Sequence, residues 1–432
     1  MKIRRTLPPA AAPLTFSDLV SGLGGLMTGR RSTARLENEL RDYFGVKHVF
    51  LVSSGKAALA TILGALKSLS PARKEVLIPA YTCYSVPSAV VKAGLNVALC
   101  DMDPERYDYD YRLFGEALSA ETLCVLSGNL CGIPSDVARM LEHCKSRGIF
   151  VVEDAAQAMG GRYKDRLIGT IADVGFFSFG RGKNITCGSG GAIVTNSDAL
   201  ASAIGKHYRP LPRPGFWENV QELFLAAFLA LFIRPALYWF PAGLPFLRLG
   251  ETVFYRDFPV KRLSGMKAGL LRRWKQRLEE YNGTRRENRN YYCNDLQLTA
   301  CGDFSDQTPM LRFPVTAVNR EMRDRIVKRL TEQGLGAGRM YPASINMIEE
   351  IKSSFSGQEY PAARTLSERL FTVPTHPLLG KEERQTICEY LQGFSGSAAF
   401  ISSPDTADFC GELERKTDVG LQELCKQESR LS

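Results

Sequence analysis

The sequence lacks the residue patterns that hold a structural metal or a disulfide framework. Its eleven cysteines are scattered, no two of them form a C-x-x-C pair, and no cysteine and histidine cluster has the spacing of a zinc site. No apolar segment of the secretory type follows Met1. These absences predict reduced thiols, a cytoplasmic location and no bound metal.

A hydrophobic run long enough to cross a bilayer is also missing. The main apolar stretch, residues 223–233, contains eleven uncharged residues, whereas a spanning helix needs roughly 20. A buried helix or a dimer contact is one interpretation of this stretch. The other is a helix lying at the membrane interface, where Arg234, Tyr238, Trp239 and Arg248 would suit headgroup depth. That arrangement would give a peripheral membrane contact through residues 223–248.

Compact runs of lysine or arginine are absent, although the net charge is +9. Without such a run, and without an RNA-binding motif, we predict no nucleic-acid partner. Attraction for a substrate that carries a diphosphate would account for the charge, and so would a generally basic surface.

Length and periodicity predict an α/β protein. A chain of 432 residues exceeds the usual size of one core, so we expect two domains. Helical patterns alternate with short apolar strands, which is typical of a mostly parallel central sheet between helices. The helices are expected at 35–44, 56–69 and 135–147, and the strands at 48–52, 75–78, 97–100, 123–126 and 150–152.

The predicted domain boundaries follow composition. Residues 1–250 are expected to form a large domain with an apolar insertion at about 211–250, and residues 251–395 a smaller α+β domain. Residues 396–432 are rich in serine and acidic residues with little periodicity, and we expect a disordered tail. In parallel sheets, ligands gather at the carboxyl ends of the strands.

One carboxylate and one amine stand out within this pattern. Asp154 follows an apolar strand, and Lys183 lies between two apolar strands. Pyridoxal phosphate (PLP) chemistry needs a lysine amine to hold the aldehyde as an imine and a carboxylate to keep the pyridine nitrogen protonated. An isolated lysine is usually a solvated charge, and an aspartate after a strand is often a helix cap. Apolar residues on both sides of Lys183 favour burial, which lowers the pKa of an amine and favours its neutral form.

Two blocks around these residues carry a family resemblance. The sequence EDAAQA occupies Glu153 to Ala158, and FSF-x-x-x-K occupies Phe177 to Lys183. Their order and separation resemble the signature of the DegT/DnrJ/EryC1/StrS family of PLP-dependent sugar aminotransferases, of PLP fold type I. The resemblance extends from about Thr33 to about Gln392 and is interrupted by the apolar insertion. It implies a homodimer with both active sites at the interface.

The resemblance also implies a loop that binds the cofactor phosphate. The family pattern S-G-T-x-A-L aligns with residues 54–59, so Gly55, Lys56 and Ala57 are the expected ligands. Backbone amides at a helix N-terminus suit an anion, while a serine before a helix is more often only a cap. Lys56 replaces the usual threonine, which keeps the amide contact and removes the hydroxyl contact.

Further contacts are implied by the same resemblance. Ser178 is expected to be a second phosphate ligand and Gln157 the neighbour of the ring hydroxyl. The position that usually stacks on the ring falls on Cys83, so Tyr84 is expected to take its place. Asn129 aligns with a polar residue of an H-L-x-G turn and is expected to approach the substrate.

Two stretches of the C-terminal half carry further predictions. Residues 260–262 read Val-Lys-Arg where the family commonly has Asn-Tyr-Arg, so a phosphate ligand from the second subunit is missing or replaced. Trp274, Leu278 and Tyr281 recur at helical spacing in a segment that also carries many arginines, among them Arg277 and Arg285. We expect these arginines to form a solvated basic face.

The resemblance implies an aminotransferase that uses an amino-acid donor, glutamate for example, and a keto sugar, expected to be nucleotide-linked. Lys183 would act as nucleophile and general base, and Asp154 would stabilise the protonated ring. Two alternatives remain at this point. One is a non-catalytic PLP-binding or membrane-docked scaffold protein, favoured by the departures at Lys56, Cys83 and Val260. The other is a sugar dehydratase of the same family, in which histidine usually replaces the lysine.

Overall fold

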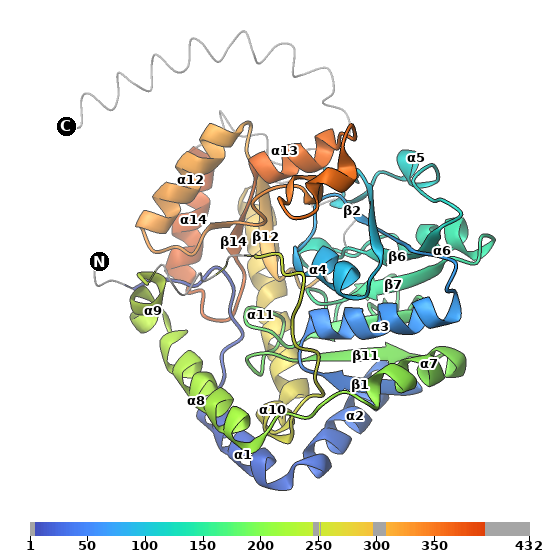
Figure 1. Ribbon diagram of the computed structural model, residues 1–432. Helices are drawn as coiled ribbons and strands as arrows, with labels where there is room; N and C mark the ends of the chain where they lie inside the picture. Colours follow the sequence, from blue (N-terminus) through green and yellow to red (C-terminus); the bar gives the residue numbers. More distant parts are fainter. Residues whose placement is uncertain (1–4, 245–249, 251, 297–307, 394–432) are drawn as a thin grey trace.

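A computed structural model of the protein describes residues 5–244, 250, 252–296 and 308–393 (Figure 1). The predicted tail, 396–432, lies outside the described residues. So does Arg248, near the end of the predicted membrane contact.

A seven-stranded sheet forms the centre of the larger part of the molecule. Its strand order is β1-β11-β10-β7-β6-β2-β3, and only β11 runs antiparallel to its neighbours. This confirms the predicted α/β fold with a mostly parallel sheet. The strands are β1 (His48–Val52), β2 (Glu75–Pro79), β3 (Asn96–Cys100), β6 (Thr122–Ser127), β7 (Phe150–Asp154), β10 (Val174–Ser178) and β11 (Gly191–Thr195).

Helices cover both faces of this sheet (Figure 1). Neighbouring strand residues point to opposite faces, so Phe176 belongs to the core under α3, whereas Phe177 packs against Phe44 of α2. The predicted elements are found with ends shifted by a few residues at most. The helices are α2 (Arg30–Phe44), α3 (Gly55–Leu69), α4 (Ser85–Lys92), α6 (Val137–Lys145) and α7 (Asp198–Tyr208).

A second, three-stranded antiparallel sheet is built from residues 312 onward. Its order is β12 (Arg312–Thr316), β14 (Leu370–Pro374) and β13 (Gly338–Arg339). The helices of this part are α12 (Arg320–Glu332), α13 (Pro361–Arg369) and α14 (Lys381–Gly393). The predicted domain boundary at residue 250 stays a prediction.

The long helix α11 (Trp274–Asp295) links the two sheets (Figure 1). Its Asn282 donates to the carbonyl of Met159, beyond β7, and its Asn288 donates to the carbonyl of Thr375, beyond β14. The remaining short elements are β4 (Met102–Asp103), β5 (Asp108–Tyr109), α5 (Tyr111–Phe114), β8 (Arg162–Tyr163), β9 (Arg166–Leu167) and the 3-10 turns Leu130–Gly132, Ile345–Met347 and Lys352–Phe355.

The apolar insertion folds as α8 (Phe216–Phe232) and α9 (Pro235–Ala242). No single helix in the described part of the chain is long and apolar enough to cross a membrane; α8 and α9 reach that criterion only as a pair bent by 118°. The predicted buried helix is not observed within the chain, because α8 buries only Asn219, Ala226 and Ala230.

Helix α8 packs beside α1 (Phe16–Thr28), which in turn packs on α10 (Gly265–Leu270) (Figure 1). Glycines allow this close approach: a Cβ added to Gly25 would lie 2.3 Å from the carbonyl oxygen of Gly265. Asp18 of α1 is fully buried and pairs with Arg277 of α11 at 3.4 Å.

Candidate active site

Asp154 stands at the carboxyl end of β7, as the sequence predicts. Strand alternation separates it from Glu153, whose buried carboxylate accepts hydrogen bonds from the amides of Gly169 and Ala172, both at 2.7 Å. Glu153 therefore braces a turn behind the sheet. Among the residues that the structure describes, the carboxylate of Asp154 accepts a hydrogen bond only from the amide of Ala156, at 2.9 Å. It therefore keeps most of its hydrogen-bonding capacity for another partner.

The pKa of Asp154 is raised to about 6. Burial is the largest cause; the hydrogen bond from the Ala156 amide and the nearby charge of Lys183 act in the opposite direction. A carboxylate held in this way gains stability when a cation is placed beside it. A protonated pyridine nitrogen is such a cation.

Asn129 lies behind Asp154 rather than in the open. It is fully buried, and its side-chain amide donates to the backbone oxygen of Asp154 at 2.8 Å and to the Ser127 hydroxyl at 3.0 Å. Its side-chain oxygen accepts from the amide of Ser135 at 3.0 Å. This placement favours a positioning role for Asn129 over the substrate contact expected from the sequence.

Lys183 lies in the connection between β10 and β11. Gly182, with φ of +67°, turns the chain in the left-handed region that favours glycine, and the amide of Lys183 bonds to the carbonyl of Gly180 at 3.3 Å. Strand β10, which leads to Lys183, pairs with β7 so that Phe176 lies opposite Asp154, and the Lys183 charge lowers the pKa of both Asp154 and Cys131. The two residues that the sequence paired are therefore brought together.

Two polar residues of α11 hold this connection in place. The Arg285 guanidinium donates to the carbonyls of Lys183, at 3.3 Å, and of Asn184, at 3.1 Å. Asn282 accepts from the Asn184 side chain at 3.1 Å. Arg285 also donates to the carbonyl of Ala11, at 3.1 Å, in the N-terminal arm.

The prediction of a solvated basic face on this helix is wrong for Arg277 and Arg285, which are both fully buried. Burial lowers the pKa of Arg285. A signal for this was present in the sequence, because the apolar stripe through Trp274, Leu278 and Tyr281 continues at the same spacing through Arg285.

The expected phosphate loop opens α3. The Ser54 hydroxyl caps the helix by accepting the amide of Ala57 at 3.1 Å. The first amides of a helix have no partner within it, so those of Gly55 and Lys56 are directed out of the N-terminus, where the helix dipole favours an anion. Ser178 borders the same spot: a Cβ added to Gly55 would lie 3.2 Å from the Ser178 hydroxyl oxygen.

The side chain of Lys56 points away from a simple phosphate contact. Its ammonium lies 4.7 Å from the ring centres of both Tyr255 and Phe258, and burial lowers its pKa. The unusual 260–262 segment runs alongside, since the amide of Ser53 donates to the carbonyl of Lys261 at 2.8 Å. The two departures from the family pattern therefore meet beside the phosphate loop.

Gln157 provides the clearest sign of a missing ligand. Its amide nitrogen donates to the Tyr341 hydroxyl at 3.0 Å, while its side-chain oxygen is buried without a partner among the described residues. A buried acceptor without a donor is costly. A ring hydroxyl at this place would satisfy it, which agrees with the role implied for Gln157.

The aromatic residues after β2 are anchored by the segment around Tyr341. Tyr81 bonds to the Tyr341 backbone amide at 3.1 Å, and the hydroxyl of Tyr84 donates to the carbonyl of Ala343 at 3.3 Å. Burial raises the pKa of Tyr84 to about 12. Cys83 is partly exposed, with its thiol 3.5 Å from the hydroxyl of Thr252. Stacking of Tyr84 on the ring stays a prediction.

Arg312, at the start of β12, was missed by the sequence reasoning. The amide of the preceding residue, Leu311, donates to the carbonyl of Cys131 at 2.7 Å, which anchors β12 beside the site. Burial lowers the pKa of Arg312, and the charges of Cys131, Tyr341 and Tyr238 act in the opposite direction. Its guanidinium has no carboxylate partner among the described residues.

These residues fit PLP. Four features match the four functional parts of the cofactor. A carboxylate with free capacity suits the ring nitrogen, a neighbouring lysine the aldehyde, an unsatisfied buried acceptor the ring hydroxyl, and a helix N-terminus beside a serine the phosphate. Asp154, Lys183, Gln157, and Gly55 with Ser178 would hold them.

The sequence matches the profile of the DegT/DnrJ/EryC1/StrS aminotransferase family over residues 20–217 and 259–392. Among curated proteins, it is 24% identical to a UDP-N-acetyl-3-dehydro-alpha-D-glucosamine 3-aminotransferase of Acidithiobacillus ferrooxidans, over 86% of this chain and 92% of that relative. It is 33% identical to the GDP-perosamine synthase of Escherichia coli O157:H7 over 38% of this chain and 45% of that relative.

Solved structures agree on the fold. Helicobacter pylori PseC, an aminotransferase involved in the biosynthesis of pseudoaminic acid, superposes with a TM-score of 0.72 at 19% identity, over 92% of this chain and 100% of that chain. The PLP form of the putative sugar aminotransferase Spr1654 from Streptococcus pneumoniae superposes with a TM-score of 0.70 at 20% identity, over 90% of this chain and 99% of that chain. A GDP-4-keto-6-deoxy-D-mannose-3-dehydratase of Escherichia coli with bound hydrated PLP gives 0.71 at 18% identity over 90% and 100%.

The family profile covers most of the sequence and stops where α8 begins, so the predicted resemblance and its interruption are both confirmed. The predicted PLP fold type I and the predicted cofactor are confirmed with it. The chain belongs to the DegT/DnrJ/EryC1/StrS aminotransferase family.

Proposed function

We propose that the protein is a PLP-dependent aminotransferase that moves an amino group from glutamate to a nucleotide-linked keto sugar. The observation that carries this proposal is the meeting of Asp154 and Lys183 at the ends of neighbouring strands, beside the Gly55 and Ser178 phosphate cradle. When bound, PLP supplies an electron sink for breaking a bond at the carbon that carries the nitrogen.

The chain's own residues divide the remaining work. Lys183 provides the amine that anchors the cofactor aldehyde and, once released, the base that carries a proton to or from the reacting carbon. Asp154 holds the proton on the ring nitrogen. Arg285 and Asn282 keep the Lys183 backbone fixed, so that the amine returns to the same place in each half-reaction.

Arg312 supports an amino-acid donor. The Arg312 guanidinium is partly buried, lies beside Cys131 and has no carboxylate partner in the described part of the chain. Its charge and its two-pronged donor group suit the α-carboxylate of an amino acid. A keto sugar has no carboxylate to offer at this position. Arg312 therefore serves the donor half-reaction.

The acceptor is proposed from the relatives and the charge. The relatives named above act on UDP-linked and GDP-linked sugars by their names, and a net charge of +9 suits a diphosphate carrier.

A dehydratase is the second candidate, since one of the similar structures has that activity. Lys183 disfavours a dehydratase, because the dehydratase branch of the family usually has histidine at the position of this lysine. We also propose a homodimer, on the basis of the resemblance, and a cytoplasmic location. The cysteines of the described part, eight in number, are free thiols, the form that a reducing compartment maintains.

The test is glutamate-dependent amination. The purified protein should be yellow and should lose that absorbance on borohydride reduction, with the label on Lys183. It should release 2-oxoglutarate through repeated turnovers only when a keto sugar is supplied. Lys183→Ala should abolish turnover with the fold intact, while Lys206→Ala, on the exposed face of α7, should leave turnover unchanged. Full turnover by Lys183→Ala, or a protein that stays colourless with added PLP, would refute the proposal. Glutamate consumption that serves only to regenerate the cofactor would identify the dehydratase.

A further inference from the structure

Two adjacent helices present apolar side chains to solvent. On α1, Phe16, Val20, Leu23 and Met27 are between 54% and 83% exposed. Their spacing of three or four residues places them along one side of the helix. A stripe of this kind on an outer helix of a folded chain is unusual, because large exposed apolar patches mark interaction surfaces.

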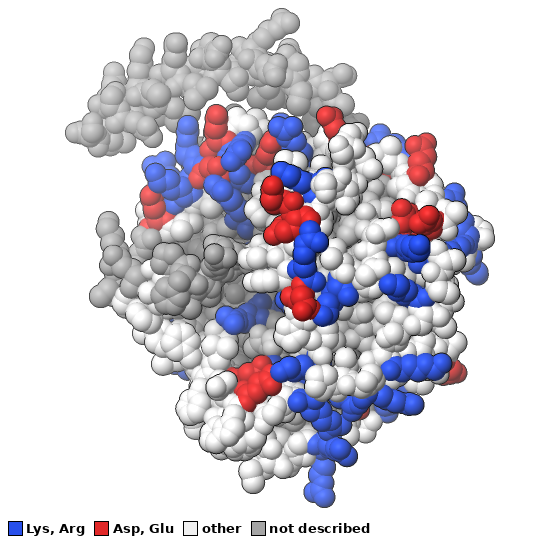
Figure 2. All heavy atoms as spheres, viewed as in Figure 1, with Lys and Arg blue, Asp and Glu red and all other residues white. Residues whose placement is uncertain are grey.

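Helix α8 carries a second stripe next to the first. Trp217 and Phe224 are 75% and 73% exposed, and Phe228 and Leu231 continue the line. Gly22 of α1 faces Leu223 of α8: a Cβ added to Gly22 would lie 3.4 Å from Leu223, so the helices lie in contact. Figure 2 shows that the lower left of this face, where α1 and α8 lie in Figure 1, carries few charged side chains.

The acidic residues of these two helices are all neutralised within the described chain. Glu218 pairs with Lys261 at 2.8 Å, and Glu222 pairs with Lys267 at 2.6 Å. Asp18, the acidic residue of α1, is buried against Arg277. The outer face of α1 and α8 therefore offers apolar groups without repelling anions.

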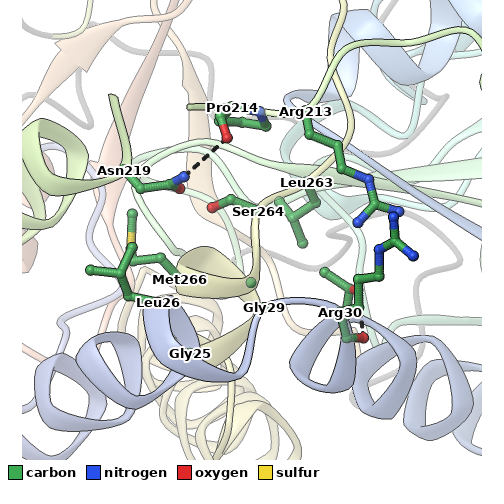
Figure 3. Close-up of a pocket in the computed structure, with 12 residues that line it drawn as sticks. Gly25, Leu26, Gly29, Arg30, Arg213, Pro214, Asn219, Leu263, Ser264 and Met266 are labelled. Carbon is green, nitrogen blue, oxygen red and sulfur yellow. Dashed lines mark hydrogen bonds between the residues drawn. The ribbon is translucent and has the colours of Figure 1, made fainter. Parts of the chain in front are cut away.

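Two arginines border this face at its edge. A pocket between α1, α10 and the start of α8 is lined by Arg30 and Arg213, whose guanidinium groups lie side by side (Figure 3). Neither guanidinium forms an ion pair or a hydrogen bond with any residue that the structure describes. Asn219 lines the same pocket with a buried side-chain oxygen that also lacks a partner among these residues. An anionic group with a hydroxyl would satisfy all three side chains.

The family profile does not match residues 218–258, which hold most of α8. The stripe on α8 therefore lies outside the segments that define the family, and the site residues described above do not account for it.

We propose that the outer face of α1 and α8 docks onto an anionic phospholipid bilayer, with both helices lying in the interface. The aromatic and aliphatic side chains enter the boundary of the acyl chains, and Arg30 and Arg213 bind headgroup phosphates. No single described helix can span the bilayer, which agrees with a helix lying on it. A second copy using the same face could cover the apolar stripes, but the acidic residues of α1 and α8 are already paired, so these helices would bring no free carboxylate to Arg30 and Arg213.

Vesicle flotation of the full chain tests this proposal. Binding is expected to vesicles that contain phosphatidylglycerol, to weaken with salt, and to be much weaker for vesicles of phosphatidylcholine alone. Trp217 provides a direct signal, because its fluorescence should shift to the blue when it leaves water. The shift should vanish in Trp217→Phe while binding persists.

Variants separate the two parts of the surface. Phe224→Gln should weaken binding to vesicles by about tenfold or more, because it removes a phenylalanine side chain that would be buried in the bilayer when the protein is bound. Arg30→Gln and Arg213→Gln should each weaken it by about fivefold. Met347→Gln and Arg329→Gln change exposed residues away from this face and serve as matched controls. All these variants should keep the transaminase activity measured in solution.

Two results would overturn the proposal. The first is no flotation with phosphatidylglycerol vesicles at low salt. The second is Trp217 fluorescence that is already blue-shifted without lipid, together with conversion of an oligomer to monomers by Phe224→Gln; this outcome would identify a second copy as the occupant. Neither result depends on whether the protein is an aminotransferase.

Discussion

Replacing Asp154 by asparagine should raise the free energy of unfolding of the cofactor-free protein. It should also reduce the stabilisation that the protein gains when PLP binds. In the folded chain the pKa of Asp154 rises from 3.8 to about 6 because of burial. A carboxyl group whose pKa is higher in the folded state favours folding in its protonated form. Its ionised form therefore lowers the free energy of unfolding. This loss is absent below about pH 4 and fully present above about pH 6.

The size of this cost follows from the shift. About two pKa units at ~1.4 kcal/mol each correspond to about 3 kcal/mol. Asp154 is only partly buried, so solvent screening reduces the expected value to about 1–2 kcal/mol. Asparagine removes the charge and retains an oxygen that can accept the amide of Ala156, which makes it a better probe than alanine.

The assay is urea unfolding of cofactor-depleted protein at pH 8 and pH 4. Asp154→Asn should have the higher free energy of unfolding at pH 8, and the two proteins should agree at pH 4. With PLP added, the variant should lose the stabilisation that the wild type gains, and turnover should fall about 10²–10³-fold. Equal stability of the two proteins at pH 8, or lower stability of the variant there, would refute the assigned environment of Asp154.

Three further substitutions test residues that the structure brought to attention. Arg285→Met leaves the carbonyls of Lys183, Asn184 and Ala11 without a donor and should cost about 3 kcal/mol in urea unfolding; kcat should fall more than KM rises, and Arg286→Met, its partly exposed neighbour, should do neither. Arg312→Gln should slow the glutamate half-reaction at least about tenfold in stopped-flow spectra, whereas amination of the keto sugar by the pyridoxamine-loaded enzyme should be unchanged; equal slowing of both would rule out a donor site. Asp18→Asn strands the buried Arg277 and should cost about 3–5 kcal/mol, and combining it with Arg277→Met should recover part of this loss; no recovery would show that the pair is not coupled.

Much of the fold could be predicted because its signals are local. Strands such as β1 and β6 are short apolar runs, and α3 begins at a serine that caps it. The Asp154 and Lys183 pair could be predicted as well, since each follows an apolar strand and parallel strands bring their carboxyl ends to one edge of the sheet.

The supporting residues of the site could not be predicted in the same way. Arg285 reads as a solvated charge in a helix that is rich in arginine. The apolar stripe on α11 indicates that Arg285 faces inward, but its partners, the carbonyls of Ala11, Lys183 and Asn184, come from distant segments. Sequence spacing does not identify these partners. Arg312 is likewise an ordinary strand residue until β12 is placed beside Cys131.

The amino-acid sequence by itself determined the order of strands and helices along the chain, the candidate pair Asp154 and Lys183, and the apolar character of the insertion, because periodicity, caps and side-chain chemistry belong to neighbouring residues. Only the tertiary structure decided which charges are buried and which apolar side chains stay outside. Trp217 and Phe224 are exposed whereas Arg277 and Arg285 are not, since burial depends on what distant segments bring to a side chain, and not on its own polarity.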